Sequence, residues 1–306
     1  MQTILGANGV IGRELSLALK DHTPHIRQVS RRPRRVNADD EICVADLLDA
    51  RATASAVAGS EVVYLVAGLP YNAATWQAQW PVAMRNTVDA CKLHGARLVF
   101  FDNVYAYGRV DGVMTEATPF NPVSKKGEVR AQISHMLLEE IRRSNLQAMI
   151  VRAADFYGPG ALNSLLHAIV FERLKAGKWP QWLGNPKALH TFSFTQDAGR
   201  AIAALGQWST AFGQTWHLPA SKEVVTSEQF VRLACELLGQ PFKLQVAPPW
   251  MAHLMGVFIP MMRENQEMMY QLLYDYRFDS SKIEAAFGLQ ATSYREGIRR
   301  SLAEAI

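Results

Sequence analysis

Three glycines spaced three residues apart are the part of this sequence that points most directly to chemistry. They stand in Gly6-Ala7-Asn8-Gly9-Val10-Ile11-Gly12, after the apolar run 2–5 and before residues 13–20, whose pattern is helical. A glycine-rich turn between a strand and a helix lets backbone N–H groups and the positive helix end approach a pyrophosphate. The spacing differs from the Gly-x-Gly-x-x-Gly pattern of many dehydrogenases. We therefore expect a dinucleotide, with a plain strand–helix connection as the alternative.

The residues that follow the second expected strand indicate which nicotinamide cofactor is bound. Ser30 and Arg31 stand where NAD-binding proteins usually carry a carboxylate for the ribose 2′-hydroxyl. A guanidinium holds a phosphate by charge-assisted hydrogen bonds, and a serine hydroxyl can add another. The sequence therefore predicts NADP(H) rather than NAD(H). Arg34 and Arg35 are interpreted as a solvated basic loop.

The elements that must position these residues alternate through the first half of the chain. Strands are expected at 3–5, 26–30, 41–44, 62–66, 97–102 and 148–151, and helices at 13–20, 47–57, 76–94 and 129–144. Apolar strands alternating with helices predict a Rossmann-type α/β fold, with a doubly wound parallel sheet covered on both faces. Ligands of such sheets bind at the carboxyl ends of the strands.

This rhythm breaks after about residue 157. The second half contains a turn at 158–160, a Trp/Gly/Pro-rich loop at 181–186, a strand entering a helix over 192–205, a short strand at 214–218, a helix at 228–238 capped by Ser227, and a Met-rich helical stretch at 248–276. We expect two interleaved units. Residues 1–157 form an NADP-binding Rossmann domain, to which parts of 190–218 return. Residues 158–306 form a smaller, mixed α/β substrate lobe.

Composition excludes several classes of protein. The 306 residues are 49% hydrophobic with a net charge of +4, which allows a large core and does not indicate nucleic acid. The only dense basic run, 31–35, has no aromatic platform beside it. The three cysteines are widely spaced without a metal-ligand pattern, so we expect no metal and a reducing compartment. No stretch is long enough to span a bilayer. The expected protein is cytoplasmic, without a signal peptide.

Several segments in order carry a resemblance to a known family. They are the Gly6/Gly9/Gly12 turn, Ala45-Asp46-Leu47, and the segments 64–68, 103–108, 152–160, 194–197 and 287–297. Together they resemble an extended short-chain dehydrogenase/reductase of the NAD-dependent epimerase/dehydratase type. The resemblance implies a set of cofactor-binding residues: Gly6, Asn8, Gly9, Val10, Ile11 and Gly12 for the pyrophosphate, Asp46 and Leu47 for the adenine, Ala67, Gly68 and Leu69 along the ribose, and Phe156. For Asp46, a helix N-cap is the alternative.

The sequence departs from this family where proton chemistry is expected. Related enzymes use a Ser or Thr and then Tyr-x-x-x-Lys, with the Tyr as acid/base. Asn103 falls at the Ser position, and the window 121–130 contains no Tyr. The preferred register places Lys126 where the Tyr belongs and Arg130 where the Lys belongs. The chain thus resembles an atypical member of this family, one that lacks the Tyr-x-x-x-Lys motif.

Two functions remain open. In the first, the protein is an NADP(H)-dependent oxidoreductase or epimerase acting on a small carbonyl or sugar-like substrate. In this function Lys126, beside the positive Arg130, is the proton donor, and Asn103 hydrogen-bonds the substrate oxygen. The phenol of Tyr105 or Tyr71 is the alternative proton donor. The alternative role for Lys126 is contact with the cofactor ribose or phosphate alone. In the second, the chain is a non-catalytic NADP(H)-binding sensor or scaffold.

The substrate and the assembly are less readable. Trp179, Trp182, Phe194, Trp250 and the Met-rich stretch suggest a small-molecule pocket, with ordinary core as the better interpretation for most of them. Arg173, Lys175 and Lys178 are the nearest candidates for a nucleotide-diphosphate clamp, and a surface helix explains them equally well. Asp155 is expected near the nicotinamide. The resemblance also implies a possible homodimer through the helices at 76–94 and 129–144.

Overall fold

A seven-stranded parallel sheet forms the centre of the molecule, whose computed structural model describes residues 1–248 and 260–303. Its strands are β1 (Gln2–Leu5), β2 (Ile26–Ser30), β3 (Glu41–Val44), β4 (Val62–Leu65), β5 (Arg97–Asp102), β7 (Ala148–Arg152) and β11 (Thr215–His217). Their spatial order is β11-β7-β5-β4-β1-β2-β3, and every neighbouring pair is parallel. The predicted Rossmann-type sheet is therefore confirmed. Its order reverses between β1 and β4, which is where such sheets bind ligands.

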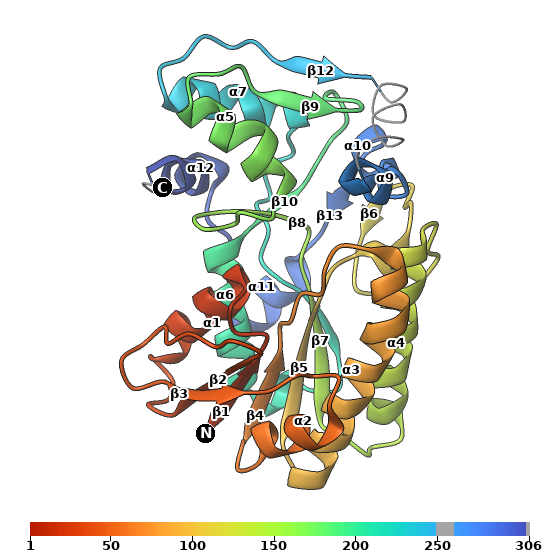
Figure 1. Cartoon of the computed structure of the whole chain (residues 1–306). Coiled ribbons are helices and arrows are strands. Elements are labelled where there is room, and N and C mark those ends of the chain that lie inside the picture. The colour runs from red at the N-terminus through yellow and green to blue at the C-terminus, as the bar shows by residue number, and fades with distance from the viewer. Residues whose placement is uncertain (249–259, 304–306) are drawn as a thin grey trace.

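Helices cover both faces of this sheet (Figure 1). One face carries α1 (Val10–Leu19), α6 (Thr195–Gln207) and α11 (Ser281–Phe287), and the other carries α2 (Ala50–Val57), α3 (Ala73–His94) and α4 (Lys125–Arg142). Each layer buries its own apolar cluster, one around Leu15, Ile202 and Ile283 and the other around Trp80, Ile133 and Phe100. The strands are apolar on both sides because both sides are covered.

The predicted strands agree with the structure to within one residue at each end, but the predicted helix starts do not. The helices expected from residues 13, 76 and 129 begin earlier, at Val10, Ala73 and Lys125. The helix expected from residue 47 begins at Ala50, because the Asp49 side chain accepts the backbone N–H groups of Arg51 and Ala52 as its N-cap. The helix assigned to a Ser227 cap is capped by Thr226 instead, in a reciprocal capping box with Gln229.

A second, smaller lobe lies above the carboxyl ends of the strands (Figure 1). Its helices are α5 (Glu172–Lys175), α7 (Ser227–Leu237), α9 (Pro260–Gln266), α10 (Tyr270–Leu273) and α12 (Tyr294–Ala303). Three two-stranded parallel pairs accompany them: β8 (Asp155–Tyr157) with β10 (Phe192–Phe194), β9 (Gln181–Leu183) with β12 (Gln245–Ala247), and β6 (Val113–Met114) with β13 (Arg277–Phe278). Short helical turns lie at Tyr105–Tyr107, His167–Phe171 and Ser209–Ala211.

Several expectations for the second half need correction. The predicted loop at 181–186 contains β9. The stretch 248–276, expected to be helical to its end, leaves the helical conformation after Leu273. Part of that stretch, 249–259 with Trp250, lies outside the described residues. Trp182 and Phe194 are buried in the core of the lobe, whereas Trp179 is 38% exposed. Across the described ranges, no helix combines the length and hydropathy needed to cross a bilayer.

Candidate functional site

The glycine turn has the geometry that a pyrophosphate cradle requires. Gly6 has φ +89°, and a Cβ there would lie 2.2 Å from the Cα of Ala67, in the loop that follows the neighbouring strand β4. A Cβ on Gly12 would lie 2.7 Å from the Ala7 carbonyl oxygen. Gly9 precedes α1 as its N-cap and has no side chain to cap the helix; a Cβ there would lie 3.7 Å from the nearest atom, the Gly6 carbonyl oxygen. The N-terminus of α1 is thus open to an anion, and these residues fit a dinucleotide pyrophosphate.

A pocket lined by arginines lies beside this turn. Its volume is about 550 Å³, and it is lined by Ala7, Asn8, Arg13, Leu17, Arg34, Arg35 and Val36. The Asn8 side chain ties the glycine turn to the basic loop, because it donates to the Arg32 carbonyl at 2.7 Å and accepts from the Arg34 N–H at 3.3 Å. Arg34 and Arg35, which we interpreted as solvated loop, therefore line a pocket. Ser30 accepts a hydrogen bond from the Arg32 N–H at 3.2 Å, and Arg31 is exposed.

The residues expected at the adenine and ribose lie where β3 and β4 end. Asp46 is exposed, and its carboxylate accepts the Leu48 N–H at 3.0 Å, so it closes a turn and does not cap α2. Leu47 follows it directly, and Ala67, Gly68 and Leu69 follow β4. Phe156 lies on β8 and stacks on Phe101 of β5, with ring centroids 5.7 Å apart. The structure thus distributes this predicted set along one edge of the sheet.

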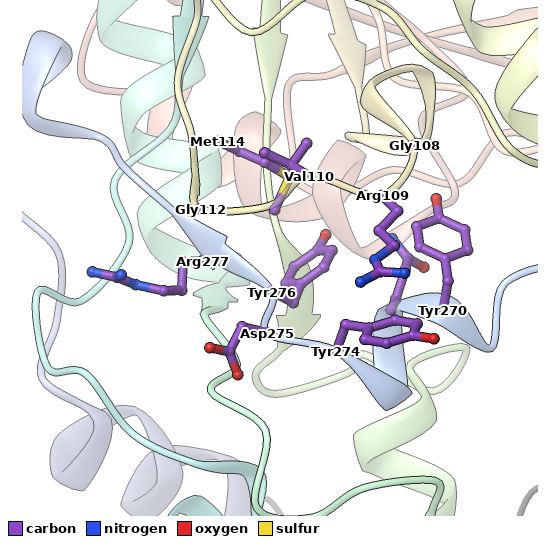
Figure 2. A pocket seen from close by; sticks show the side chains of 11 residues that line it. Gly108, Arg109, Val110, Gly112, Met114, Tyr270, Tyr274, Asp275, Tyr276 and Arg277 are labelled. Carbon is purple, nitrogen blue, oxygen red and sulfur yellow. The ribbon is translucent and has the colours of Figure 1, made fainter.

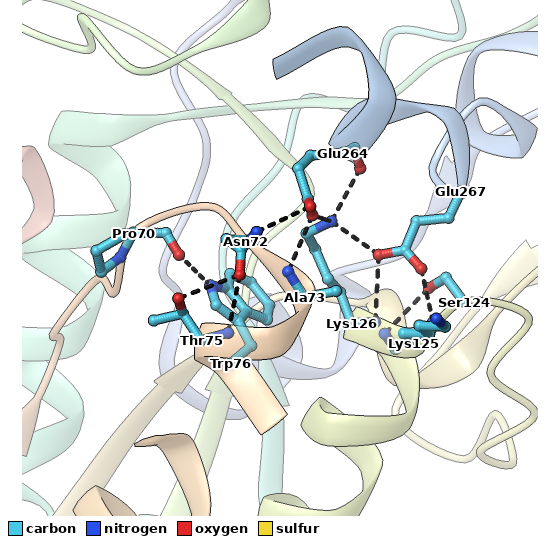
Figure 3. Close-up of polar contacts among 11 residues, drawn as sticks. Pro70, Asn72, Ala73, Thr75, Trp76, Ser124, Lys125, Lys126, Glu264 and Glu267 are labelled. Carbon is cyan, nitrogen blue, oxygen red and sulfur yellow. Dashed lines mark hydrogen bonds and ion pairs between the residues drawn. The ribbon is translucent and has the colours of Figure 1, made fainter. Parts of the chain in front are cut away.

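Lys126 does not have the surroundings that we expected. Its side chain is fully buried, and Nζ lies 2.8 Å from a carboxylate oxygen of Glu264 and 2.8 Å from one of Glu267 (Figure 3). The Glu264 carbonyl oxygen accepts a third hydrogen bond at 2.8 Å. The expected positive neighbour is wrong, since two carboxylates and not Arg130 contact the ammonium.

The same two glutamates reach the N-termini of two helices. Glu264 accepts hydrogen bonds from the Ala73 N–H and the Asn72 side chain at the start of α3, both at 2.9 Å. Glu267 accepts the Lys125 N–H at the start of α4 at 2.8 Å. Burial alone would raise the pKa of Glu264, but hydrogen bonds from Lys126 and Ala73 bring it below its ordinary value. Carboxylates are stabilised at these positive helix ends. We call Lys126, Glu264 and Glu267 the clasp.

Arg130, expected where the Lys of the Tyr-x-x-x-Lys motif belongs, is also engaged elsewhere. Its Nε donates to Asp102 at 2.6 Å, and its guanidinium lies 4.4 Å above the Trp80 ring. Asn103, expected to bond the substrate, accepts the Tyr105 N–H at 3.0 Å and so shapes the turn after β5. Its amide nitrogen makes none of the hydrogen bonds found within the described residues.

Tyrosines and one aspartate surround the place where β4, β5 and β7 end. The Tyr71 ring lies 4.6 Å from Lys126 Nζ, and the hydroxyls of Tyr71 and Tyr105 interact. Asp155 is held by His190 at 3.0 Å. Burial and the charge of Asp155 raise the pKa of Tyr270. Tyr71 and Tyr105 were the alternative phenols of the sequence interpretation.

Sequence reasoning missed Glu264, Glu267, Tyr270 and His190. The i, i+3 spacing of the glutamates indicates a shared helix face. Their partner Lys126 lies 138 and 141 positions earlier, however, and no local pattern carries that distance.

A small pocket adjoins the tyrosines at the junction of the two lobes (Figure 2). The segment 108–112 forms one wall and the segment 270–277 the other. The Arg109 guanidinium lies 3.6 Å above the Tyr274 ring. The Tyr270 hydroxyl is buried and has no hydrogen-bond partner in the described chain. The pocket holds only about 10 Å³, too little for a substrate by itself.

Comparisons with known proteins agree with this geometry. The family described as the NAD dependent epimerase/dehydratase family matches residues 3–216. The Thermus thermophilus UDP-glucose 4-epimerase, solved with NAD, is similar with a TM-score of 0.80 and 18% identity, covering 99% of this chain and 98% of the other. DesIV of Streptomyces venezuelae, a dTDP-glucose 4,6-dehydratase solved with NAD, has a TM-score of 0.81 and 18% identity, covering 99% and 95%. No curated protein sequence matches the chain.

Proposed function

Because the chain belongs to the NAD-dependent epimerase/dehydratase family, we propose that it is an NADP(H)-dependent oxidoreductase or epimerase acting on a small carbonyl or sugar-like compound. The observation that carries this proposal is the glycine cradle beside an arginine-lined pocket. When bound, the nicotinamide supplies or accepts a hydride. Gly6, Gly9 and Gly12 would hold its pyrophosphate. Family membership alone leaves the substrate open.

The preference for NADP(H) rests on charge. Ser30 ends β2 and Arg31 follows it, while Arg34 lines the pocket with Arg13. A 2′-phosphate would therefore meet cations and no carboxylate at the end of β2. We expect Arg31→Ala to weaken NADPH binding at least about tenfold and to leave NADH binding unchanged. Binding is measured by titration, with Arg295→Ala, an exposed residue of α12, as the matched control. An unchanged NADPH dissociation constant would remove Arg31 from the site, and the same loss in Arg34→Ala would place the phosphate in the pocket.

For the acid/base we propose Lys126, which stands at the helix position of the missing tyrosine. A proton would pass from Nζ to the substrate oxygen as a hydride adds to the carbonyl carbon, and Asn103 would hydrogen-bond that oxygen. The clasp holds Nζ between carboxylates, so this role requires substrate to replace one of them. Tyr71, whose ring centroid lies 4.6 Å from Lys126 Nζ, is the alternative proton donor.

The experiment is NADPH consumption with a panel of aldehydes, ketones, enones and keto-sugars. Lys126→Ala should abolish turnover, by about 10²–10⁴-fold in kcat, while NADPH still binds. The Glu264→Gln/Glu267→Gln variant breaks the clasp but keeps the lysine. If this variant loses as much activity as Lys126→Ala, the lysine acts by forming ion pairs that hold the site together, and it is not the proton donor. A loss in Tyr71→Phe alone would transfer the role to the phenol.

A non-catalytic NADP(H)-binding sensor or scaffold is the second candidate. The observation that favours it is that Lys126 and Arg130, the replacements for the catalytic Tyr and Lys, are both held in buried ion pairs. Tight NADPH binding without turnover of any panel compound would support it. Turnover that depends on Lys126 or Tyr71 would exclude it.

We also propose a homodimer through α3 and α4, which pack side by side and expose Val82 and Leu93. Sedimentation that shows only monomer at micromolar concentration would contradict it.

A further inference from the structure

The loop between β2 and β3 carries the arginines beside the glycine turn and is held in place at two points. It follows Ser30, the last residue of β2, and ends at Asp40, directly before β3. At the first point, the Arg34 N–H donates to the Asn8 side chain of the glycine turn at 3.3 Å. Residues 34–36 then line the pocket beside that turn. The second point is the carboxylate of Asp40.

Asp40 is buried, and its carboxylate accepts hydrogen bonds from three parts of the chain. Oδ2 accepts the backbone N–H groups of Val36 and Asn37 of the loop, at 3.1 and 2.7 Å. The same oxygen accepts the Gln28 amide of β2 at 2.8 Å and the Ser16 hydroxyl of α1 at 3.3 Å. One carboxylate thus joins the loop to the sheet and to the helix that follows the glycine turn.

The Asn37 side chain adds to this attachment. Its amide donates to the Ser16 carbonyl oxygen at 3.1 Å and to the other oxygen of Asp40, also at 3.1 Å. In the sequence of α1, Ser16 stands between Arg13 and Leu17, which line the same pocket as the loop. The part of the pocket wall that the loop contributes is therefore tied to the part that α1 contributes.

The charge of Asp40 is not used in an ion pair. Among the described residues, the neighbouring Asp39 pairs with Lys20 at 3.4 Å, whereas no lysine or arginine pairs with Asp40. Burial alone would raise the pKa of Asp40, but hydrogen bonds, first of all from Asn37, bring it below its ordinary value. The group is therefore a carboxylate at neutral pH, stabilised by the donors that it holds in place.

This negative charge has two opposite effects on an anion in the pocket, whose wall includes its hydrogen-bond partner Val36. Through its field, the carboxylate repels a phosphate. Through its hydrogen bonds, it fixes the backbone that carries Arg34 and Arg35, so that less freedom is lost when a ligand binds. The two effects can be told apart, because removal of the carboxylate strengthens phosphate binding in the first case and weakens it in the second.

We propose that Asp40 is a positioning residue for cofactor selection, which holds residues 34–37 against α1 and so presents Arg34 and Arg35 to the 2′-phosphate of NADP(H). The proposal rests on the proposed function for the preference for NADP(H). It adds a buried residue that acts through the backbone of the loop and whose removal changes the choice between NADPH and NADH.

The test is titration of NADPH and NADH into Asp40→Ala and Asp40→Asn. We expect Asp40→Ala to raise the NADPH dissociation constant at least about tenfold and to change that of NADH less than about twofold. Asp40→Asn keeps the shape and one accepting oxygen, so it should retain NADPH binding to within about threefold. Tighter NADPH binding by both variants would show that the charge acts through its field and would overturn the proposal. An unchanged preference for NADPH over NADH in Asp40→Ala overturns it as well.

A milder variant keeps the test decisive if Asp40→Ala does not fold. Asn37→Ala removes the side-chain bonds to α1 and leaves the backbone donors of the carboxylate, and it should weaken NADPH binding about three- to tenfold. The control is Asp39→Asn, which removes the same charge from an exposed neighbour and should leave both dissociation constants unchanged. Asn37→Ala with the preference of the unaltered protein would contradict the proposal.

Arginine variants separate this proposal from the proposed function. Unchanged NADPH binding in both Arg34→Ala and Arg35→Ala would overturn the role of Asp40, even where Arg31→Ala weakens that binding and so supports the proposed function. Equal affinity of the unaltered protein for NADPH and NADH would instead refute the proposed preference for NADP(H) itself.

Discussion

At the scale of single residues, one carboxylate holds two buried guanidiniums behind the candidate site. Asp102 accepts from Arg130 at 2.6 Å, from Arg152 at 3.2 Å and from Ser134 at 3.0 Å, and its side chain is fully buried. Arg152 also donates to Tyr107, whose hydroxyl lies 2.8 Å from His217. This network fixes the end of β5, from which Asn103 and Tyr105 emerge.

Removing Asp102 should be strongly destabilising. Asp102→Ala leaves two guanidiniums buried without a counter-charge, and we expect the free energy of unfolding to fall by about 3–5 kcal/mol. Denaturant titration measures the loss. Glu139→Ala, which breaks the exposed pairs with Arg142 and Arg143, should change stability little. A loss below about 1 kcal/mol for Asp102→Ala would mean that the guanidiniums find other partners.

His217 should make stability depend on acid. Burial lowers its pKa from 6.5 to about 3, so the unfolded chain binds a proton first as the pH falls. The contribution is complete above pH 6.5 and is lost on acidification towards the folded value. Between pH 7 and 5, the native protein should lose about 2 kcal/mol more than His217→Gln. Unfolding is measured at both pH values, with the exposed His94→Gln as control; equal losses would show that His217 is protonated in the fold.

Predictability at this scale depended on whether a residue's partners are close in sequence. Gly6, Gly9 and Gly12 were found because their turn is one short segment. The environment of Lys126 was not predicted, because Glu264 lies on the distant α9 and Glu267 directly follows that helix.

At the scale of elements, α1 and α6 approach each other closely enough to require a glycine. A Cβ on Gly199 of α6 would lie 2.6 Å from the backbone carbon of Glu14 on α1. This contact closes the layer that supports the glycine turn at the start of α1. The two helices are far apart in sequence, so the requirement is invisible before the fold is known.

Gly199→Ala should therefore destabilise the protein by about 2–3 kcal/mol, because the helices must separate to admit a methyl group. Thermal or denaturant unfolding measures this change. Gly68→Ala is the control, since nothing lies within 4 Å of a Cβ there and its φ is ordinary. An equal stability of the two variants would show that α6 shifts without cost.

The elements themselves were largely readable, and their boundaries at helix starts were not. Continuous apolar runs identify parallel strands because both faces are buried. Asp46, Asp49, Thr226 and Ser227 are all capable N-caps, and only the backbone geometry selects Asp49 and Thr226.

At the scale of the whole molecule, the clasp fastens the second lobe to the Rossmann domain. Glu264 and Glu267 lie more than a hundred residues after the starts of α3 and α4 in the sequence, yet they contact both helix starts (Figures 1 and 3). The chain also returns to the sheet through α6, β11 and α11. The sequence indicated some of this interleaving at 190–218, whereas the return of α11 carried no local signal.

Breaking the clasp should destabilise the assembly of the two lobes. We expect Glu264→Ala/Glu267→Ala to lose about 3 kcal/mol, since it leaves the Lys126 ammonium buried and unpaired. Adding Lys126→Met should recover most of this loss, because a similar apolar side chain needs no counter-charge. Calorimetry of the double and triple variants measures both steps. If Lys126→Met brings no recovery, the glutamates act mainly through the helix N-termini.

The clasp also constrains the routes by which this sequence can change. A tyrosine at position 126, where we propose that lysine replaces the usual acid/base, would leave Glu264 and Glu267 facing each other without the ammonium between them. Replacing the glutamates first would strand the lysine. Each single step passes through a weakened protein, while the three changes together are tolerable, so the effects of substitutions at these positions are not additive. Under our proposal for Lys126, the lysine is thus held in place by its neighbours, and a change to tyrosine at this position would have to be accompanied by changes at both glutamates.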